Sequence, residues 1–238
     1  MSGPRPPEPK FQNLKPMKAA LIPMKSLAQA KMRLADALDR HERASLALAM
    51  LTDIIVACNE SGCFDLVSVI SDDSEVFWQA RELGAKPLAE PATLSGLNEG
   101  LTFGQRYLAR RVAVAELIIL PADIPLARPE DIRAVIDALG ADATPRAVLV
   151  RSRDNGTNAL ALRPPEAIAM HYGPNSADAH RAAIEAANIE VVELTNDRLA
   201  FDVDSPEDLA AMSTMQVGAA TSAWLETRAH HARKEPAS

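Results

Sequence analysis

The sequence lacks the features of secreted, zinc-binding and membrane-spanning proteins. Its only two cysteines, Cys58 and Cys63, have no further Cys or His pair at metal-ligand spacing, so we expect reduced thiols and neither a zinc site nor a disulfide framework. No apolar run approaches the roughly 20 residues that span a bilayer, and the proline-rich start has no apolar signal core. We therefore expect a cytoplasmic protein that enters no membrane.

The sequence also lacks an excess of positive charge. Its 25 Lys and Arg residues face 32 Asp and Glu residues, which gives a net charge of −7. This balance disfavours a broad surface for nucleic acid. A few local cations can still bind a small phosphorylated ligand, so the composition favours a metabolite enzyme.

Glycine-rich phosphate-binding motifs are missing as well. The chain contains neither a P-loop motif nor the Gly-x-Gly-x-x-Gly dinucleotide motif, and no glycine lies between Gly3 and Gly62. Any phosphate site must therefore be built in another way.

The chain does contain short apolar strands that alternate with amphipathic helices. The predicted strands are 17–22, 66–70, 86–90, 116–120, 147–150, 159–162 and 189–194, and the predicted helices are about 40–58, 74–83, 98–110, 129–139, 176–187 and 205–212. We expect Ser74, Asn98, Ser176 and Ser205 to cap helices, and Pro129 to start one. This alternation predicts a three-layer α/β/α sandwich with a mostly parallel sheet.

The pattern also divides the chain into three parts. Residues 1–16 hold five prolines and are expected to form a disordered tail. Residues 17–212 are expected to form a single domain, followed by a peripheral C-terminal helix and tail over 213–238.

Ligands of such folds bind beyond the carboxyl ends of the strands. The loop after the first predicted strand carries three cations there, Lys25, Lys31 and Arg33, which could clamp a triphosphate. A solvated basic loop is the alternative interpretation of the same residues.

Three aspartates are candidates for binding a metal ion. Asp123 follows an apolar strand, and Asp202 and Asp204 alternate in an extended stretch, so that both point the same way. Mg²⁺ is typically held by one or two carboxylates together with substrate phosphates. A turn aspartate at 123 and a helix cap at Asp204 or Ser205 are the structural alternatives.

Small polar residues form a fourth group, in which glycines allow a ligand to approach the backbone. Each member could equally be a turn or a cap, and His41, His171 and His180 are expected to be structural. The group comprises Gly96 to Asn98, Asn155 to Asn158 and Gly173 to Ser176.

Taken together and in this order, these motifs resemble the CofC/FbiD family of guanylyltransferases from coenzyme F-420 biosynthesis, which have a nucleotidyltransferase (GT-A-like) fold. The similarity extends from about residue 18 to residue 212. Two positions differ, with Met32 where the family often has threonine and Asn155 where it usually has a second glycine. The matching motifs are Ile22-Pro23-x-Lys25, Ala30-Lys31-x-Arg33-Leu34, Gly96-Leu97-Asn98, Pro121-Ala122-Asp123-x-Pro125, Gly156-Thr157-Asn158, Gly173-x-x-Ser176 and Asp202-Val203-Asp204-x-Pro206-Glu207-Asp208-Leu209.

The resemblance implies a role for each motif. It implies that GTP contacts Pro23, Lys25, Lys31, Arg33, Gly96, Leu97 and Asn98, and that the acceptor contacts Thr157, Asn158, Gly173 and Ser176. It also implies that Asp123, Asp202 and Asp204 bind Mg²⁺, with Asp123, Lys25, Lys31 and Arg33 as the catalytic residues.

The implied reaction moves GMP from GTP to a small phosphorylated three-carbon acid and releases pyrophosphate. The acid would be phosphoenolpyruvate, 3-phospho-D-glycerate or 2-phospho-L-lactate, and a downstream transferase of the pathway is a potential partner. The alternatives are a molybdenum-cofactor or sugar-phosphate nucleotidyltransferase, a glycosyltransferase of the same fold, or a silent GTP- or metabolite-binding module. Nucleotidyltransferases of the molybdenum-cofactor and sugar-phosphate types usually carry a glycine-rich first loop, which is absent here.

Overall fold

The computed structural model describes residues 16–234, so the tail predicted for residues 1–16 lies outside the described residues except for Pro16. The strands are β1 (Met17–Pro23), β2 (Leu66–Ser71), β3 (Lys86–Ala89), β4 (Val114–Ile119), β5 (Arg146–Arg151), β6 (Thr157–Arg163) and β7 (Glu190–Glu193). The helices are α1 (Arg40–Ser61), α2 (Ser74–Glu82), α3 (Leu97–Arg111), α4 (Pro129–Asp137), α5 (Ser176–Ala186), α6 (Pro206–Met212) and α7 (Ala219–Lys234). Two short 3₁₀ turns, Leu27–Gln29 and Met32–Leu34, lie between β1 and α1.

The strands form one seven-stranded sheet in the order β3-β2-β1-β4-β6-β5-β7. Strands β1 to β4 are parallel to one another, and β5 is parallel to β7. Strand β6 alone runs antiparallel to both of its neighbours. The predicted mostly parallel sheet is therefore confirmed, with one reversed strand.

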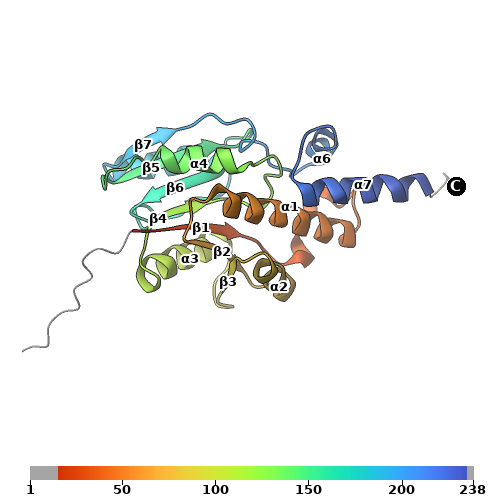
Figure 1. Cartoon of the computed structure of the whole chain (residues 1–238), viewed down its shortest axis with the longest axis horizontal. Coiled ribbons are helices and arrows are strands. Elements are labelled where there is room, and N and C mark those ends of the chain that lie inside the picture. Colours follow the sequence, from red (N-terminus) through yellow and green to blue (C-terminus); the bar gives the residue numbers. More distant parts are fainter. Residues whose placement is uncertain (1–15, 235–238) are drawn as a thin grey trace, which may run out of the picture.

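Helices cover both faces of the sheet, as the apolar character of its strands requires. In β1, Ala20 and Ile22 pack into the core beneath α1, α2 and α4, whereas Ala19 and Leu21 pack into the core beneath α3 and α5. Figure 1 shows α1 and α4 on the near side of the sheet. The predicted three-layer sandwich is thus confirmed.

Three of the helix starts differ from the prediction. The N-cap of α2 is Asp73, whose carboxylate accepts from the Glu75 backbone N–H, and not Ser74. Helix α3 begins after Gly96 and α5 after Asn175, neither of which caps with its side chain. Asn98 and Ser176 therefore lie inside the first turn, where their side chains can contact other segments.

Two other helix starts are as expected. Ser205 caps α6 in a capping box with Asp208, and Pro129 is the first residue of α4. Both are strong local start patterns that need no distant partner.

The C-terminal helix packs on α1. Both carboxylate oxygens of Asp53 in α1 accept hydrogen bonds from the start of α7, at the Ala220 and Thr221 N–H groups, each 2.9 Å away. Trp224 of α7 also donates a hydrogen bond to Ser45 of α1 at 2.9 Å. A third apolar cluster, which includes Phe201 and Val217, lies beside this contact.

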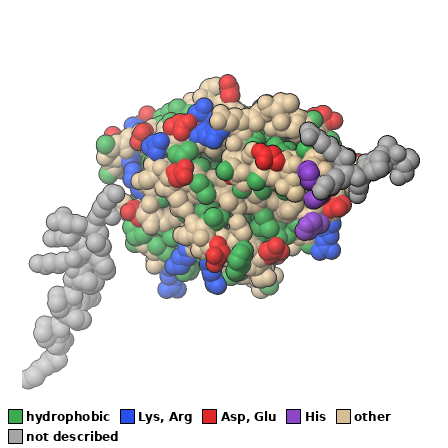
Figure 2. Space-filling view, turned by 45° about the vertical axis from the view of Figure 1, so that its right-hand side comes forward, with side chains coloured by type: hydrophobic (Ala, Val, Ile, Leu, Met, Phe, Trp, Pro, Cys, Tyr) green, Lys and Arg blue, Asp and Glu red, His purple; other side chains and the backbone are tan. Residues whose placement is uncertain are grey.

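Within the described residues, α1 is the one helix long and apolar enough to cross a membrane, and 61% of its most apolar window is buried inside the protein. It lies between α4, α2 and α7, so its apolar side chains belong to the core. Lys, Arg, Asp and Glu side chains are interspersed over the face of the molecule in Figure 2, without a broad patch of one sign.

Candidate active site

The carboxyl ends of β1 and β4 form one wall of a cavity of about 400 Å³. The loop after β1, the loop after β4, the start of α3, α1 and Asp204 supply the lining. Seven of the predicted site residues lie in this lining: Pro23, Lys25, Lys31, Arg33, Leu97, Asp123 and Asp204. The structure therefore gathers the three predicted phosphate-binding cations and two of the three predicted metal ligands at one place.

Lys31 lies at the centre of this group. Its Nζ is 2.5 Å from Asp123 Oδ2 and 3.0 Å from Asp204 Oδ1. Burial alone would lower the pKa of Lys31, but the charges of the two carboxylates outweigh burial and raise it. The ammonium therefore stays charged and neutralises part of the carboxylate pair.

The backbone brings the two aspartates together. The Val203 N–H donates to the Asp123 carbonyl at 3.1 Å, which anchors the extended 202–204 segment beside the loop after β4. Val203 is fully buried, whereas Asp202 and Asp204 on either side of it are partly exposed. This is the alternation predicted from the sequence, although the segment forms no regular strand.

The other two cations are more accessible than Lys31. The Arg33 side chain is 75% exposed and lies 3.0 Å from Asp204 Oδ2, while Lys25 is exposed at the mouth of the cavity. Arg33 can move toward an anionic ligand at small cost, because exposed ion pairs are weak.

A divalent cation fits this place on two grounds. Asp123 Oδ1 is buried and has no hydrogen-bond partner, and Asp204 turns a carboxylate toward the same ammonium. Among residues 16–234, however, no three Asp, Glu, His or Cys side chains form a ready-made metal-binding group. The residues present thus suit Mg²⁺ held by two carboxylates and completed by substrate phosphates.

Asp202 interacts with this pair through its charge. Burial, and then the nearby charge of Asp123, raise the pKa of Asp202 to about 6. Its Oδ1 accepts a hydrogen bond from Asn158 Nδ2 at 3.3 Å, which connects it to the start of β6. Its role as a metal ligand stays a prediction.

The predicted acceptor residues form a hydrogen-bonded group at the other side of Asp202. Ser176 Oγ lies 3.1 Å from Thr157 Oγ1, which in turn lies 3.0 Å from His180 Nδ1. The pairing of β5 with β6 is irregular at Arg151, so Thr157 contacts α5 while the next residue, Asn158, contacts Asp202. Bulges of this kind often orient side chains beside active sites.

The tautomer of His180 follows from its other contact. The His171 N–H donates to His180 Nε2 at 2.9 Å, so a neutral ring carries its proton on Nδ1 and donates it to Thr157. Burial, and to a lesser extent His171, lower the pKa of His180 to about 4. The expectation of a structural histidine agrees with this arrangement, and the sequence did not reveal its contact with Thr157.

Three positions in the acceptor loops have a positive φ: Asn155, Gly173 and Asn175. Asn155 has a φ of 68°, which suits the glycine usual in the family, but asparagine tolerates this conformation. Its side chain donates to Asp178 Oδ2 at 2.8 Å and so ties the loop to α5. Gly173 has a φ of 141°, and nothing lies within 4 Å of where a Cβ would be.

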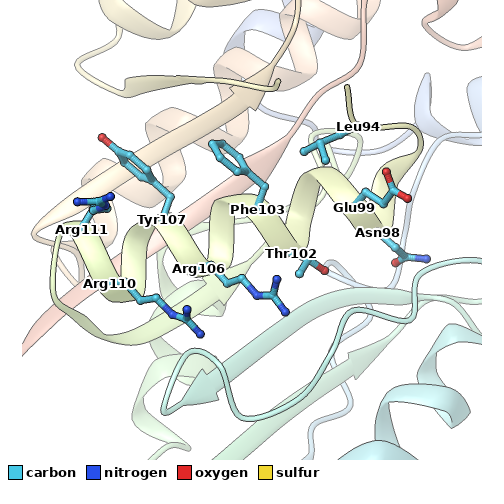
Figure 3. Close-up of a pocket in the computed structure, with 9 residues that line it drawn as sticks. All are labelled: Leu94, Asn98, Glu99, Thr102, Phe103, Arg106, Tyr107, Arg110 and Arg111. Atoms are coloured by element: carbon cyan, nitrogen blue, oxygen red, sulfur yellow. The ribbon is translucent and has the colours of Figure 1, made fainter. Parts of the chain in front are cut away.

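The three nucleotide-binding residues predicted at the start of α3 line three different cavities. Leu97 lines the cavity with Asp123, Gly96 lines a neighbouring cavity, and Asn98 lies at one end of a shallow hollow of about 540 Å³ along the outer face of α3 (Figure 3). The Asn98 amide is engaged with the Tyr172 backbone, to which it donates at 2.8 Å and from which it accepts at 2.7 Å. Its contact with the nucleoside stays a prediction.

Comparison with known proteins agrees with this geometry. Residues 17–230 match the family model described as guanylyl transferase CofC like. A phosphoenolpyruvate guanylyltransferase of Sphaerobacter thermophilus is 38% identical over 194 residues, which covers 82% of this chain and 91% of the relative. The enzyme of that name from Rubrobacter xylanophilus is 40% identical over 196 residues, covering 81% and 92%.

Solved structures support the fold. A Desulfovibrio desulfuricans G20 protein described as a nucleotide-diphospho-sugar transferase superposes with a TM-score of 0.72 at 16% identity, covering 92% of this chain and 98% of its own. A nucleotidyl transferase from Methanothermobacter superposes with a TM-score of 0.60 at 13% identity, covering 89% and 99%. The fold is therefore that of nucleotidyltransferases, and the sequence match makes the assignment narrower: the chain belongs to the CofC-like family of guanylyl transferases.

Proposed function

We propose that this protein transfers GMP from GTP to the phosphate of phosphoenolpyruvate and releases pyrophosphate, as a cytoplasmic step of coenzyme F-420 biosynthesis. The observation that carries the proposal is that Lys31 forms ion pairs with both Asp123 and Asp204 in the cavity at the strand ends. The names of the relatives from Sphaerobacter and Rubrobacter support phosphoenolpyruvate as the acceptor.

Charge is the main obstacle to this reaction. GTP carries about four negative charges and the acceptor about three at neutral pH, because a phosphate monoester has a second pKa near 6. Lys25, Lys31 and Arg33 would bind the phosphates of GTP and offset part of this charge. A bound Mg²⁺, held by Asp123 and Asp204, would supply further neutralisation of the phosphates.

The covalent step is an in-line substitution at the α-phosphorus of GTP. An oxygen of the acceptor's phosphate forms the new P–O bond, and the bond to the pyrophosphate oxygen breaks. The attacking oxygen is already ionised at neutral pH, so no general base is needed. The chain's residues act by positioning the two phosphates and stabilising their charge.

The acceptor would lie between the start of β6 and the start of α5. Thr157 and Ser176 would hold its phosphate or carboxylate by hydrogen bonds, with Asn158 and Gly173 lining the same place. Because Thr157 Oγ1 accepts hydrogen bonds from His180 Nδ1–H and from the Ser176 hydroxyl, its own hydroxyl proton is available to donate to an anion.

A matrix of four nucleoside triphosphates against three acids, with pyrophosphate release as the readout, tests this proposal. We expect the fastest release with GTP and phosphoenolpyruvate, in the presence of Mg²⁺. Faster release with 3-phospho-D-glycerate or 2-phospho-L-lactate would reassign the acceptor. Binding of GTP in a calorimeter without pyrophosphate release for any pair would instead indicate a binding module.

A further inference from the structure

A second cavity of about 460 Å³ adjoins the first at the ends of β2 and β3. Lys25 and Gln29 line both cavities, so the two are adjacent parts of one cleft. A ligand whose phosphates lie beside Lys31 and Arg33 can therefore extend past Lys25 into the second cavity.

The two cavities differ in charge. The first contains Lys31 and Arg33 beside Asp123 and Asp204, whereas the second contains the carboxylates of Asp72 and Glu90 with Lys25 at the shared rim. Carboxylates repel phosphates, so the second cavity is unsuited to the triphosphate end of a nucleotide. It suits an uncharged group that donates hydrogen bonds.

The remaining walls of the second cavity favour a flat, partly apolar group. The side chains of Phe77, Pro91 and Leu94 contribute apolar surface, and Gly96 contributes backbone without a side chain. Nucleotide bases bind between apolar surfaces of this kind with a few polar groups at their edges.

Glu90 is the less exposed of the two carboxylates in this cavity. Its backbone N–H donates to Ser71 at 2.8 Å, and its side chain packs against α3, where a Cβ at Gly100 would lie 2.6 Å from Glu90 Oε1. Among the described residues its carboxylate accepts no hydrogen bond and makes no ion pair within 4 Å. Burial, and then the charge of Asp72, raise the pKa of Glu90, so a hydrogen-bond donor would stabilise its ionised form.

We propose that Glu90 selects guanine, by accepting hydrogen bonds from the N1–H and the 2-amino group of the base in the second cavity. These two donors are adjacent on the guanine edge and match the two oxygens of one carboxylate. This inference rests on the proposed function, because it takes the nucleotide phosphates to lie in the first cavity.

The same carboxylate disfavours the other purine. Adenine presents an N1 lone pair in place of the guanine N1–H and a C2–H in place of the 2-amino group, so both donors are lost and a lone pair faces the carboxylate. A site built to accept hydrogen bonds rejects an analogue that lacks the donor much more strongly than a purely apolar pocket does.

The test compares Glu90→Gln with the wild-type chain and with Glu82→Gln, an exposed control at the end of α2. Dissociation constants of GTP, ITP and ATP are measured by calorimetry without acceptor, beside pyrophosphate release with phosphoenolpyruvate. We expect Glu90→Gln to raise the dissociation constant of GTP by about 10- to 100-fold and to leave that of ATP unchanged or lower it. Thermal melting checks that each variant is folded.

ITP isolates one of the two hydrogen bonds, because inosine lacks the 2-amino group. We expect the wild-type chain to bind GTP about tenfold more tightly than ITP, and Glu90→Gln to reduce this difference. An unchanged GTP-to-ATP ratio in Glu90→Gln would overturn the inference, as would a loss of selectivity in Asp72→Asn alone.

The outcome is separable from that of the proposed function. If the wild-type chain prefers GTP in the calorimeter and Glu90→Gln loses this preference, but no pyrophosphate is released, the proposed reaction fails while the role of Glu90 stands. If it releases pyrophosphate but Glu90→Gln keeps its base preference, the reaction stands and the role of Glu90 fails.

Discussion

At the scale of single residues, the site depends on how Asp123 is held. One of its oxygens is bound to the Lys31 ammonium and the other is buried without a hydrogen-bond partner. A buried carboxylate oxygen without a partner is unfavourable unless a ligand completes it. Asp123 is therefore the residue whose charge matters most to the proposed reaction.

Replacing Asp123 by asparagine keeps the volume of the side chain and removes its charge. We expect Asp123→Asn to lower the rate of pyrophosphate release by about 100-fold or more, because stabilisation of phosphate charge is lost. Asp137→Asn, at the exposed end of α4, is the control and should keep its activity. Near-normal turnover in a folded Asp123→Asn would contradict the assigned role.

The buried His180 predicts a stability effect with a definite sign. The unfolded ring takes up a proton near pH 6.5, whereas the native ring has its pKa lowered to about 4. The unfolded state therefore binds more protons between these values, and this residue lowers the free energy of unfolding as the pH falls from 6.5 to 4, by about 3 kcal/mol in total.

Comparison with His180→Asn isolates this contribution. Asp202, whose raised pKa has the opposite effect in a similar pH range, is present in both proteins and cancels in the difference. Urea unfolding at several pH values should show a shallower loss of stability at low pH in His180→Asn than in the wild type. His41→Asn, exposed on α1, should follow the wild type, and equal slopes for all three proteins would refute the burial argument.

At the scale of elements, α3 connects the site to the sheet. Its first residue, Leu97, and the preceding Gly96 border one cavity each, and its Gly104 lies against β1, where a Cβ would be 2.9 Å from Leu21 Cδ2. Leu21 is fully buried and has little room to move. The close approach of α3 to the sheet thus depends on this glycine.

Alanine at position 104 is therefore expected to destabilise the protein. Overpacking of a core costs about 1–3 kcal/mol, and the higher helix propensity of alanine returns about 1 kcal/mol. Denaturant unfolding should show a net loss for Gly104→Ala, whereas Thr102→Ala on the outer face of α3 should change stability by less than about 0.5 kcal/mol. A stabilised Gly104→Ala would show that Leu21 can move.

Local sequence patterns predicted where strands and helices lie better than they predicted which strands pair and in which direction. The apolar runs of β1 and β4 and the serine and proline at the start of α6 are short-range features, and the structure confirms them. The reversed direction of β6 depends on pairing with β4 and β5, which no local pattern encodes. The cap of α2 was misassigned because Asp73 and Ser74 are adjacent and both can accept the hydrogen bond.

At the scale of the whole molecule, the site joins segments that are distant in the chain. Lys31 bonds Asp204, which is 173 positions later, and Asn158 bonds Asp202. The position of Lys31 after the first strand predicted that it would lie at the carboxyl edge of the sheet, and the family resemblance implied that Asp204 would join it there. Neither could predict their direct ion pair, which depends on the packing of α6 and the 202–204 segment.

The contact of α7 with α1 lies outside the active site. It therefore predicts an effect on stability without an effect on activity. Asp53 accepts two hydrogen bonds from the first turn of α7, in the manner of a helix cap. We expect Asp53→Ala to lower the free energy of unfolding by about 1–2 kcal/mol, with unchanged pyrophosphate release below the melting temperature. Glu226→Gln, exposed on α7, serves as the control, and an undiminished melting temperature in Asp53→Ala would contradict a stabilising contact.

The central claim is that the acceptor's phosphate attacks the α-phosphorus of GTP. Phosphoenolpyruvate carrying ¹⁸O in its phosphate, incubated with GTP, Mg²⁺ and the full chain, tests it directly when the products are analysed by ³¹P NMR, in which a bound ¹⁸O shifts the phosphorus resonance. We predict that pyrophosphate carries no label and that one ¹⁸O bridges the two phosphorus atoms of the guanylylated acid, so that the former α-phosphorus of GTP is also shifted. An unshifted former α-phosphorus, labelled pyrophosphate, or no guanylylated product at all would contradict the account.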